Sequence, residues 1–392
     1  MSHEGTPAPE IRPFQIQVPS EELDDLRDRL ASTRWPAQPY GTGWERGVPL
    51  DYLQGLADYW SNGFDWATQE KDLNRFTQHV TTVDGQDIHF VHAPSPEPEA
   101  LPLVLLHGWP ASFVEFKRVI DPLSDPGAHG GNAADAFHVV VPSIPGFGYS
   151  PQPQEPGWST GRVAATVVEI MHRLGYERYG AHGGDIGAGV AAGLSPADPA
   201  GVVGVHVASD PPTAVSFTMF AGDPAQIPGL SDDERERVET MKETSADDMG
   251  YLQIQSTRPQ TLAYGLNDSP VAQLAWIVEK FRAWTDPAAE LPEDAVDRDH
   301  LLTNVALYWF TGTGASSAHF LYDSMHAQDW GDEGTAPTGF AVFGRDTVTR
   351  RLMDPEHRIE HWTEFDRGGH FPAMEVPELL VQDIRSFFRP LR

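Results

Sequence analysis

A single aspartate, Asp185, lies in the run GAHGGDIGAGV, between a stretch typical of a strand and one typical of a helix. A sharp strand-to-helix turn exposes the residue at its apex and leaves little room for neighbouring side chains. The flanking residues Gly183, Gly184, Gly187 and Ala188 are correspondingly small. An aspartate that attacked an acyl group would only form an anhydride, whereas attack on an electrophilic sp3 carbon gives an ester on the enzyme. The run therefore predicts a carboxylate nucleophile, and a Gly-rich turn with a solvated aspartate is the alternative.

An ester on Asp185 must be hydrolysed, which requires a general base to activate water and an acid to orient that base. The turn resembles the nucleophile turn of α/β-hydrolases, in which the acid and then the histidine follow along the chain. His370, in DRGGHFPAMEVP, comes after the last predicted strand and before the C-terminal helix, where the base belongs. We expect Asp346, just beyond the predicted strand FAVFG, to be the acid, and Asp354 and Glu364 are weaker candidates.

Two backbone N–H groups complete such a site by stabilising an oxyanion. One belongs to the residue after the nucleophile, Ile186, and the other to the loop HGWPASF, which makes Trp109 the second donor. A cis bond before Pro110 could aim the Trp109 amide inward. A buried turn at the end of a strand is the alternative for HGWP.

The elements that must position these residues are visible as apolar runs separated by turn signals. LPLVLLH from Leu101 and FHVVVPSI from Phe137 are typical of strands with both faces covered. Asp84-Gly85 predicts the turn of a hairpin. Ser159 can cap a helix that runs to Leu174, and Ser20 is the expected N-cap of the helix SEELDDLRDRL. Alternating strands and helices predict an α/β fold with a mostly parallel, doubly wound sheet.

Changes in pattern along the chain divide it into four parts. We expect an N-terminal segment over residues 1–80, the first part of the core over 81–210, a helical cap inserted over 211–334, and the second part of the core over 335–392. The cap region is helical and acidic, and the chain closes with an amphipathic helix, VPELLVQDIRSFFR.

Composition excludes several classes of partner. The 392 residues carry a formal net charge of -30, so nucleic acid and anionic membranes are repelled at long range. No cysteine is present, which excludes disulfides and thiolate chemistry. The N-terminus lacks the pattern of a secretory signal, and the apolar runs are shorter than a membrane span, so we expect a cytoplasmic protein. His357 and His361 are four residues apart without a third ligand, and we expect exposed histidines, with neither metal nor cofactor.

Longer strings carry a more specific resemblance that covers nearly the whole chain. They are IRPFQIQVPSEELDDLRDRLASTRWP, HGWPASFVEF, GGDIGAGV, GYLQIQSTRPQTLAYGLNDSPVAQLAWIVEKFRAWT, LLTNVALYWFTGTGASS and RGGHFPAMEVPELLVQDIRSFF. They resemble epoxide hydrolases of the microsomal type, in their soluble bacterial branch without a membrane anchor. The resemblance implies an α/β-hydrolase core with a helical cap and conversion of an epoxide to a vicinal diol. It also implies Asp185 as nucleophile, His370 as base, Asp346 as acid and Tyr251, in the cap, as a donor to the epoxide oxygen.

This chain departs from the family at the position of the second cap tyrosine. In the family this tyrosine lies four residues beyond a Ser pair. The residue at that position here is Leu321, and Tyr322 follows one residue later. One residue is about 100° of rotation on a helix, so Tyr322 can serve as second donor only if the backbone adjusts.

Two other functions remain open from the residues alone. Haloalkane or haloacid dehalogenases use the same scaffold and nucleophile, but often hold the halide with a Trp directly after the nucleophile, where this chain has Ile186. A non-catalytic fold that only binds a ligand is the other alternative. Relatives of similar composition occur in bacterial natural-product pathways, which favours an aromatic or styrene-like epoxide by analogy. A homodimer is compatible with the sequence.

Overall fold

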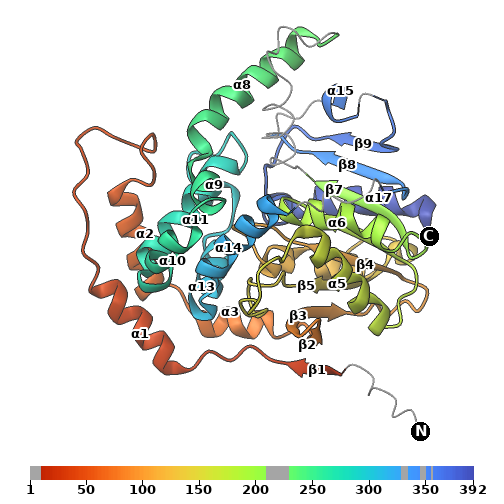
Figure 1. Ribbon diagram of the computed structural model, residues 1–392, viewed down its shortest axis with the longest axis horizontal. Helices are drawn as coiled ribbons and strands as arrows, with labels where there is room; N and C mark the ends of the chain where they lie inside the picture. The colour runs from red at the N-terminus through yellow and green to blue at the C-terminus, as the bar shows by residue number, and fades with distance from the viewer. Residues whose placement is uncertain (1–9, 209–228, 328–333, 345–349, 355) are drawn as a thin grey trace.

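The computed structural model describes residues 10–208, 229–327, 334–344, 350–354 and 356–392, and at its centre is a nine-stranded sheet (Figure 1). The order of the strands is β1-β2-β3-β5-β4-β6-β7-β8-β9. Their bounds are β1 Ile11–Phe14, β2 Gln78–Val83, β3 Gln86–Ala93, β4 Leu101–Leu106, β5 Phe137–Pro142, β6 Tyr179–Gly183, β7 Val202–Ala208, β8 Thr338–Val342 and β9 His361–Glu364.

The sheet combines an antiparallel edge with a parallel centre. Strands β1 to β3 pair antiparallel, β3 pairs antiparallel with β5, and every pair from β5 across to β9 is parallel. Asp84 and Gly85 join β2 to β3 with φ of 55° and 77°, as a two-residue type I′ turn requires. The predicted hairpin and the mostly parallel sheet are confirmed.

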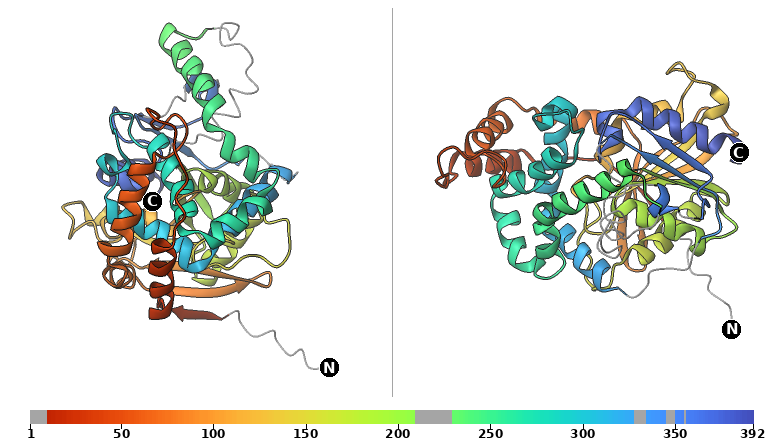
Figure 2. Two further views of the ribbon diagram at one scale, coloured as in Figure 1. Left: turned by 90° about the vertical axis from the view of Figure 1, so that its left-hand side faces the viewer. Right: turned by 90° about the horizontal axis from the view of Figure 1, so that it is seen from above.

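Helices cover both faces of this sheet, which explains why the central strands are apolar throughout (Figure 2). Helices α5 Thr160–Arg173 and α6 Ile186–Ala197 lie on one face, and α17 Pro377–Phe388 lies on the other. Ser159 caps α5, because its hydroxyl accepts a hydrogen bond from the Arg162 amide at 3.3 Å. Short elements complete the core: η1 Phe113–Arg118, α4 Ile120–Ser124, η2 Ala133–Asp135, α15 Arg350–Met353, α16 Pro372–Glu375 and η4 Arg389–Leu391.

The chain between β7 and β8 forms a group of helices beside the sheet (Figure 1). They are α8 Asp232–Asp248, α9 Gly250–Gln255, α10 Pro259–Asp268, α11 Pro270–Trp284, α12 Pro292–Ala295, α13 Arg298–Thr311 and α14 Thr313–His326. We call this group the cap. Ser269 begins α11 by accepting a hydrogen bond from the Ala272 amide, followed by Pro270 in the first turn.

The N-terminal helices α1 Ser20–Ala31, α2 Leu50–Asn62 and α3 Trp66–Leu73 lie against the cap. The hydroxyls of Tyr52 and Tyr59 on α2 each donate a hydrogen bond of 2.8 Å, to Glu293 and to Asp299. The expectation for Ser20 is wrong in detail. Ser20 is already the first residue of α1, Pro19 is the N-cap, and no side chain caps this helix.

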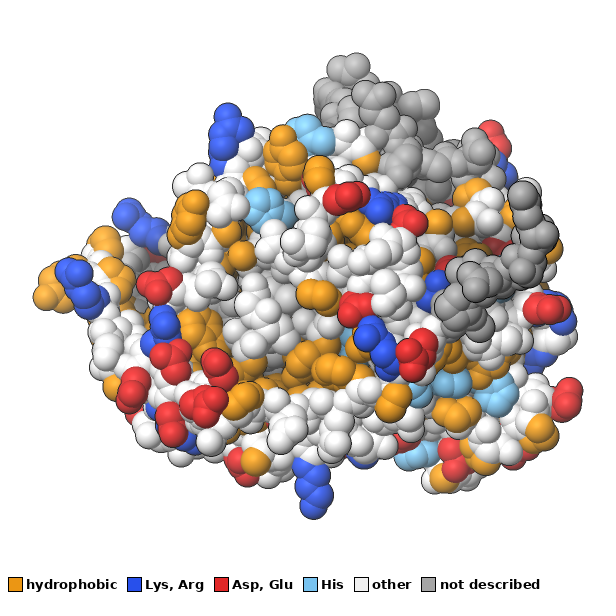
Figure 3. Space-filling model, turned by 60° about the horizontal axis from the view of Figure 1, so that its bottom comes forward, with side chains coloured by type: hydrophobic (Ala, Val, Ile, Leu, Met, Phe, Trp, Pro, Cys, Tyr) orange, Lys and Arg blue, Asp and Glu red, His pale blue; other side chains and the backbone are white. Residues whose placement is uncertain are grey.

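Charged side chains of both signs are spread over the surface, as the face in Figure 3 shows. Acidic side chains gather at the end formed by the N-terminal helices, and on α1 Glu21, Glu22, Asp24, Asp25 and Asp28 are exposed. Of the helices in the described ranges, none has the length and apolar character that a bilayer crossing requires.

Candidate active site

Asp185 sits at the apex of the turn between β6 and α6 in a conformation that few non-glycine residues adopt. Its φ is 52° and its ψ is -128°. The neighbouring glycines are required by close contacts: a Cβ on Gly187 would lie 2.0 Å from the Leu106 carbonyl oxygen, and one on Gly183 would lie 2.2 Å from that of Gly187. A Cβ on Gly108 would lie 2.3 Å from Asp185 itself. The small flanking residues therefore let β4, β6 and α6 approach closely enough to present this carboxylate.

A backbone amide already holds one oxygen of the Asp185 carboxylate. The Trp109 N–H donates a hydrogen bond of 2.9 Å to Asp185 Oδ1. The Trp109–Pro110 peptide bond is cis, as the sequence suggested. Ile186 is the first residue of α6, so its N–H has no acceptor inside the helix. Of the two amides expected for an oxyanion site, that of Trp109 binds Asp185 Oδ1, and that of Ile186 directly follows Asp185 in the chain.

His370 faces the other oxygen of Asp185, with 3.4 Å between its Nε2 and Asp185 Oδ2. The loop that carries it is docked on the cap, because the His370 amide donates to the Trp284 carbonyl at the end of α11 at 2.8 Å. Gly369 permits this contact, since a Cβ there would lie 2.6 Å from the same carbonyl oxygen. The indole ring of Trp284 packs edge-on against the imidazole, with 5.1 Å between ring centroids.

The orienting acid expected at Asp346 lies outside the described residues. The described range that precedes it, residues 334–344, contacts the segment that leads to His370: Phe343 stacks on Phe365, and the Gly344 amide donates to the Arg367 carbonyl at 3.5 Å. Within the described residues, His370 Nδ1 is buried and has no hydrogen-bond partner. This is the ring nitrogen that an orienting carboxylate binds.

The two weaker candidates for the acid, Asp354 and Glu364, form hydrogen bonds with other residues. Asp354 is buried, and its carboxylate accepts hydrogen bonds from the amides of Arg358 and Ile359, which closes the turn before β9. Glu364 is exposed and accepts a hydrogen bond from the indole of Trp362 at 2.9 Å. Within the described ranges, neither carboxylate forms a hydrogen bond or ion pair with His370.

Tyr251, at the start of α9, lies above the nucleophile loop. Its ring stacks on Trp109 with 4.9 Å between centroids and 8° between planes, and Trp284 packs edge-on against it. Burial and the charge of Asp185 both raise the pKa of Tyr251, so its hydroxyl stays protonated. No hydrogen bond of this hydroxyl is recorded in the described ranges, which leaves it available as a donor.

Tyr322 is not brought to this site. It lies on the outer side of α14, where its side chain is 37% exposed and stacks on His326 at 4.2 Å. A rotation of one residue along a helix explains this, because no irregularity is present in α14 to compensate for it. The structure instead places Tyr308 of α13 near Asp185, fully buried, with its hydroxyl donating to the Ala111 carbonyl at 2.6 Å.

A small cavity lies between Asp185 and His370. It is lined by Gly108, Trp109, Ala111, Glu115, Gly184, Asp185, His370 and Phe371. Glu115 was not expected from the sequence. Burial, reinforced by the charges of Asp185 and Glu375, raises its pKa to about 8, so it is a neutral carboxylic acid near pH 7. Its place in HGWPASFVEF was the signal that could have identified it.

A separate group of histidines lies under the sheet. His206 and His361 donate to the two oxygens of Asp383 at 2.9 Å each, and His182 bonds the other ring nitrogen of His206 at 2.8 Å. The ligand atoms of His206, His361 and Asp383 are close enough to hold a metal ion, but these groups already satisfy one another by hydrogen bonds. His361 is therefore not the exposed residue that we expected, because Asp383 of α17 reaches it; His357 is exposed.

Comparisons with known proteins agree with this geometry over nearly the whole chain. The family model described as Epoxide hydrolase N terminus matches residues 11–116, and that described as alpha/beta hydrolase fold matches residues 102–236. A putative epoxide hydrolase of Stigmatella aurantiaca is 43% identical over 97% of this chain and 86% of its own length. Epoxide hydrolase 1 of Sus scrofa is 34% identical over 96% of this chain and 88% of its own.

A solved structure extends the similarity to three dimensions. The crystal structure of juvenile hormone epoxide hydrolase from the silkworm Bombyx mori matches with a TM-score of 0.86 and 28% identity, over 98% of this chain and 95% of that one. Fold, cap and sequence all agree. The chain therefore belongs to the epoxide hydrolases of the α/β-hydrolase superfamily, enzymes that hydrolyse an ether bond.

Proposed function

We propose that this epoxide hydrolase opens its substrate through a covalent ester on Asp185. The observation that carries the proposal is the position of this carboxylate, with Oδ1 bound by the Trp109 amide at 2.9 Å and Oδ2 facing His370 at 3.4 Å. Oδ2 attacks an epoxide carbon while the ring C–O bond breaks. The released alkoxide is a poor leaving group at neutral pH, and the Tyr251 hydroxyl stabilises its charge by donating a hydrogen bond.

In the second step His370 takes a proton from water, and the water oxygen attacks Cγ of the ester. The oxyanion forms on Oδ1, where the amides of Trp109 and Ile186 stabilise it. Collapse breaks the Cγ–Oδ2 bond, so Oδ2 leaves with the diol and takes the proton from His370. The second proton of the water, left on the Asp185 carboxyl, makes up for the one that the alkoxide took up in the first step. We propose Asp346 as the carboxylate that orients His370. Two observations support it: His370 Nδ1 is buried without a partner among the described residues, and Phe343, just after β8, stacks on Phe365 in the segment before His370.

The ester is tested by trapping it. Without a base, His370→Gln is expected to stop after alkylation, so incubation with styrene oxide adds the mass of the epoxide to the Asp185 peptide. In wild-type enzyme, a single turnover in heavy-oxygen water is expected to label the carboxylate of Asp185 and to leave the diol unlabelled. Label only in the diol would contradict the ester pathway.

The rings around Asp185 support an aromatic substituent on the epoxide. Trp109, Tyr251 and Trp284 form a continuous aromatic group, with centroids 4.9 to 6.2 Å apart. Aromatic pairs of this kind favour ring substituents by offset or edge contacts. A panel of aryl, alkyl and fused-ring epoxides with chiral product analysis tests this, and a preference for short alkyl epoxides would contradict it.

A further inference from the structure

The carboxyl of Glu115 lies where the second step of the reaction takes place. Glu115 is only 8% exposed, and it lines the same small cavity as Asp185 and His370. No hydrogen bond to its carboxyl oxygens is recorded in the described ranges, although buried polar groups in proteins are nearly always paired. A carboxyl without a protein partner in the described ranges, lining the same cavity as Asp185 and His370, can bind a water molecule there, and the cavity has room for about one.

We propose that Glu115 is a positioning residue that holds the hydrolytic water between itself and His370. This inference rests on the proposed function, because it concerns hydrolysis of the ester on Asp185. The water donates one hydrogen to His370 Nε2 and the other to the Glu115 carbonyl oxygen, so that an oxygen lone pair points at Cγ of Asp185. As the water oxygen bonds to Cγ its proton moves to His370, and the diol oxygen takes that proton when the ester bond breaks.

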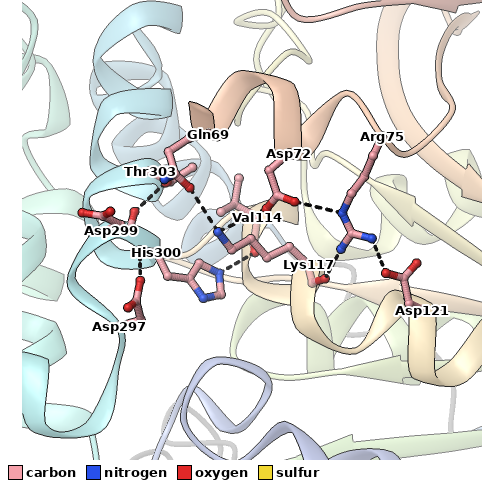
Figure 4. Close-up of polar contacts among 10 residues, drawn as sticks. All are labelled: Gln69, Asp72, Arg75, Val114, Lys117, Asp121, Asp297, Asp299, His300 and Thr303. Carbon is pink, nitrogen blue, oxygen red and sulfur yellow. Dashed lines mark hydrogen bonds and ion pairs between the residues drawn. The ribbon is translucent and has the colours of Figure 1, made fainter. Parts of the chain in front are cut away.

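The short helix η1, which carries Glu115, is held by contacts with α13 of the cap and with the N-terminal segment (Figure 4). Within η1, the Val114 carbonyl accepts a hydrogen bond from His300 of α13 at 2.8 Å. Lys117 reaches Gln69 and Asp72 of α3, at 3.3 and 3.6 Å. Arg75, which follows α3, donates a hydrogen bond to the Lys117 carbonyl of η1 at 3.2 Å. The N-terminal segment and the cap therefore both fix the loop that supplies this carboxyl.

The charge state of Glu115 suits this role. The groups that face it are Asp185 from the nucleophile turn, Glu375 of α16, Tyr308 of α13 and His370. An ionised Glu115 would repel the oxyanion that forms on Asp185, whereas a neutral carboxyl does not. The ester neutralises Asp185, so during hydrolysis only burial and Glu375 keep the pKa of Glu115 raised. We therefore expect ester hydrolysis to slow as pH rises through a value below the Glu115 pKa of about 8 in the resting enzyme.

The two chemical steps must be measured separately in single turnovers, by quenching and quantifying the alkylated Asp185 peptide. Glu115→Leu removes the hydrogen bond and is expected to slow ester hydrolysis at least about tenfold while alkylation is unaffected. Glu115→Gln keeps a neutral carbonyl of the same shape, so it is expected to hydrolyse the ester near the wild-type rate at pH 7 and to lose the decline at higher pH. Asp135→Asn alters another buried carboxyl, which pairs with Arg389 away from the cavity, and is the control for stability.

The outcomes separate this inference from the proposed function. If wild-type enzyme forms no ester on Asp185, the proposed function fails. If the ester forms and Glu115→Leu hydrolyses it as fast as wild type, or if Leu and Gln slow both steps equally, the positioning role is wrong. Should Glu115→Leu fail to fold, the pH profiles of wild type and Glu115→Gln decide, because identical profiles would overturn the role.

Discussion

At the scale of single residues, two oxygens of one carboxylate have different surroundings. Oδ1 of Asp185 is tied to the Trp109 amide, and Oδ2 faces His370. The carboxylate is therefore held in one orientation before substrate binds, and in the proposed mechanism the oxygen that becomes the carbonyl of the ester already contacts the Trp109 amide. Such preorganisation is a large contribution to catalysis, because no reorientation is required during the reaction.

Tyr251 and Tyr322 provide a matched pair of substitutions. Tyr251→Phe removes a donor aimed into the site and is expected to slow alkylation by about 100-fold, since one such donor contributes on the order of 3 kcal/mol. Tyr322→Phe removes a hydroxyl on the outer side of α14 and is expected to leave the alkylation rate unchanged. Rapid-quench single turnovers measure both. A loss in Tyr322→Phe as large as that in Tyr251→Phe would contradict the assignment.

At the scale of elements, the close approach of α6 to β4 determines where the nucleophile stands. Pairs of small residues bring the two together, and the helix begins directly after Asp185. We propose the division into an N-terminal segment over 1–80, core over 81–210 and 335–392, and cap over 211–334. The segment is not separate from the sheet, since β1 pairs with β2 at its edge.

Two glycines on α6 test this close approach. Gly187→Ala places a Cβ 2.0 Å from the Leu106 carbonyl oxygen, so the expected result is loss of activity and a free energy of unfolding lowered by about 1–3 kcal/mol or more. Gly189→Ala meets only Thr160 at 3.5 Å, an ordinary contact. It is expected to stabilise the helix by up to about 1 kcal/mol. Denaturant unfolding measures both, and equal stability of the two variants would contradict the argument.

At the scale of the whole molecule, the core contains several histidines that remain neutral when folded. Burial lowers the pKa of His89 and of His300 to about 3, and that of His107 to about 4. Two of them form bonds that a neutral imidazole can make: His89 with Ser143 and Gln78, and His107 as the acceptor of the Ile144 amide. The folded protein therefore resists protonation at sites that the unfolded chain protonates readily.

Stability is expected to fall in mild acid for this reason. These histidines titrate near pH 6.5 when unfolded, so below that pH the unfolded chain binds more protons and the free energy of unfolding decreases. The loss begins near pH 6.5, continues to about pH 4 for His107 and to about pH 3 for His89 and His300, and reaches about 1.4 kcal/mol per pH unit for each histidine. Urea unfolding across this range measures the slope. His300→Gln removes one of these histidines and is expected to reduce the slope by the contribution of one proton. His319→Gln changes a partly exposed histidine and is the control. Equal slopes in the two variants would contradict the explanation.

Local sequence determined much of the fold and the centre of the site. The strands, the Asp84-Gly85 turn and the nucleophile turn depend on runs of neighbouring residues whose spacing and size are visible in the chain. The sequence also predicted that His370 and Asp185 lie close together, because the order of elements places both at the same edge of a parallel sheet. In the structure they are 3.4 Å apart.

Only the tertiary structure decided which side chains from distant elements share the cavity. In the sequence Glu115 is one acidic residue among 57, and only its burial beside Asp185 distinguishes it from the others. Tyr322 could be judged only from the direction in which α14 presents it, and His361 only from the approach of Asp383 on α17. The physical reason is the same in each case. Burial, charge and partner depend on packing between segments, which residue spacing along the chain does not contain.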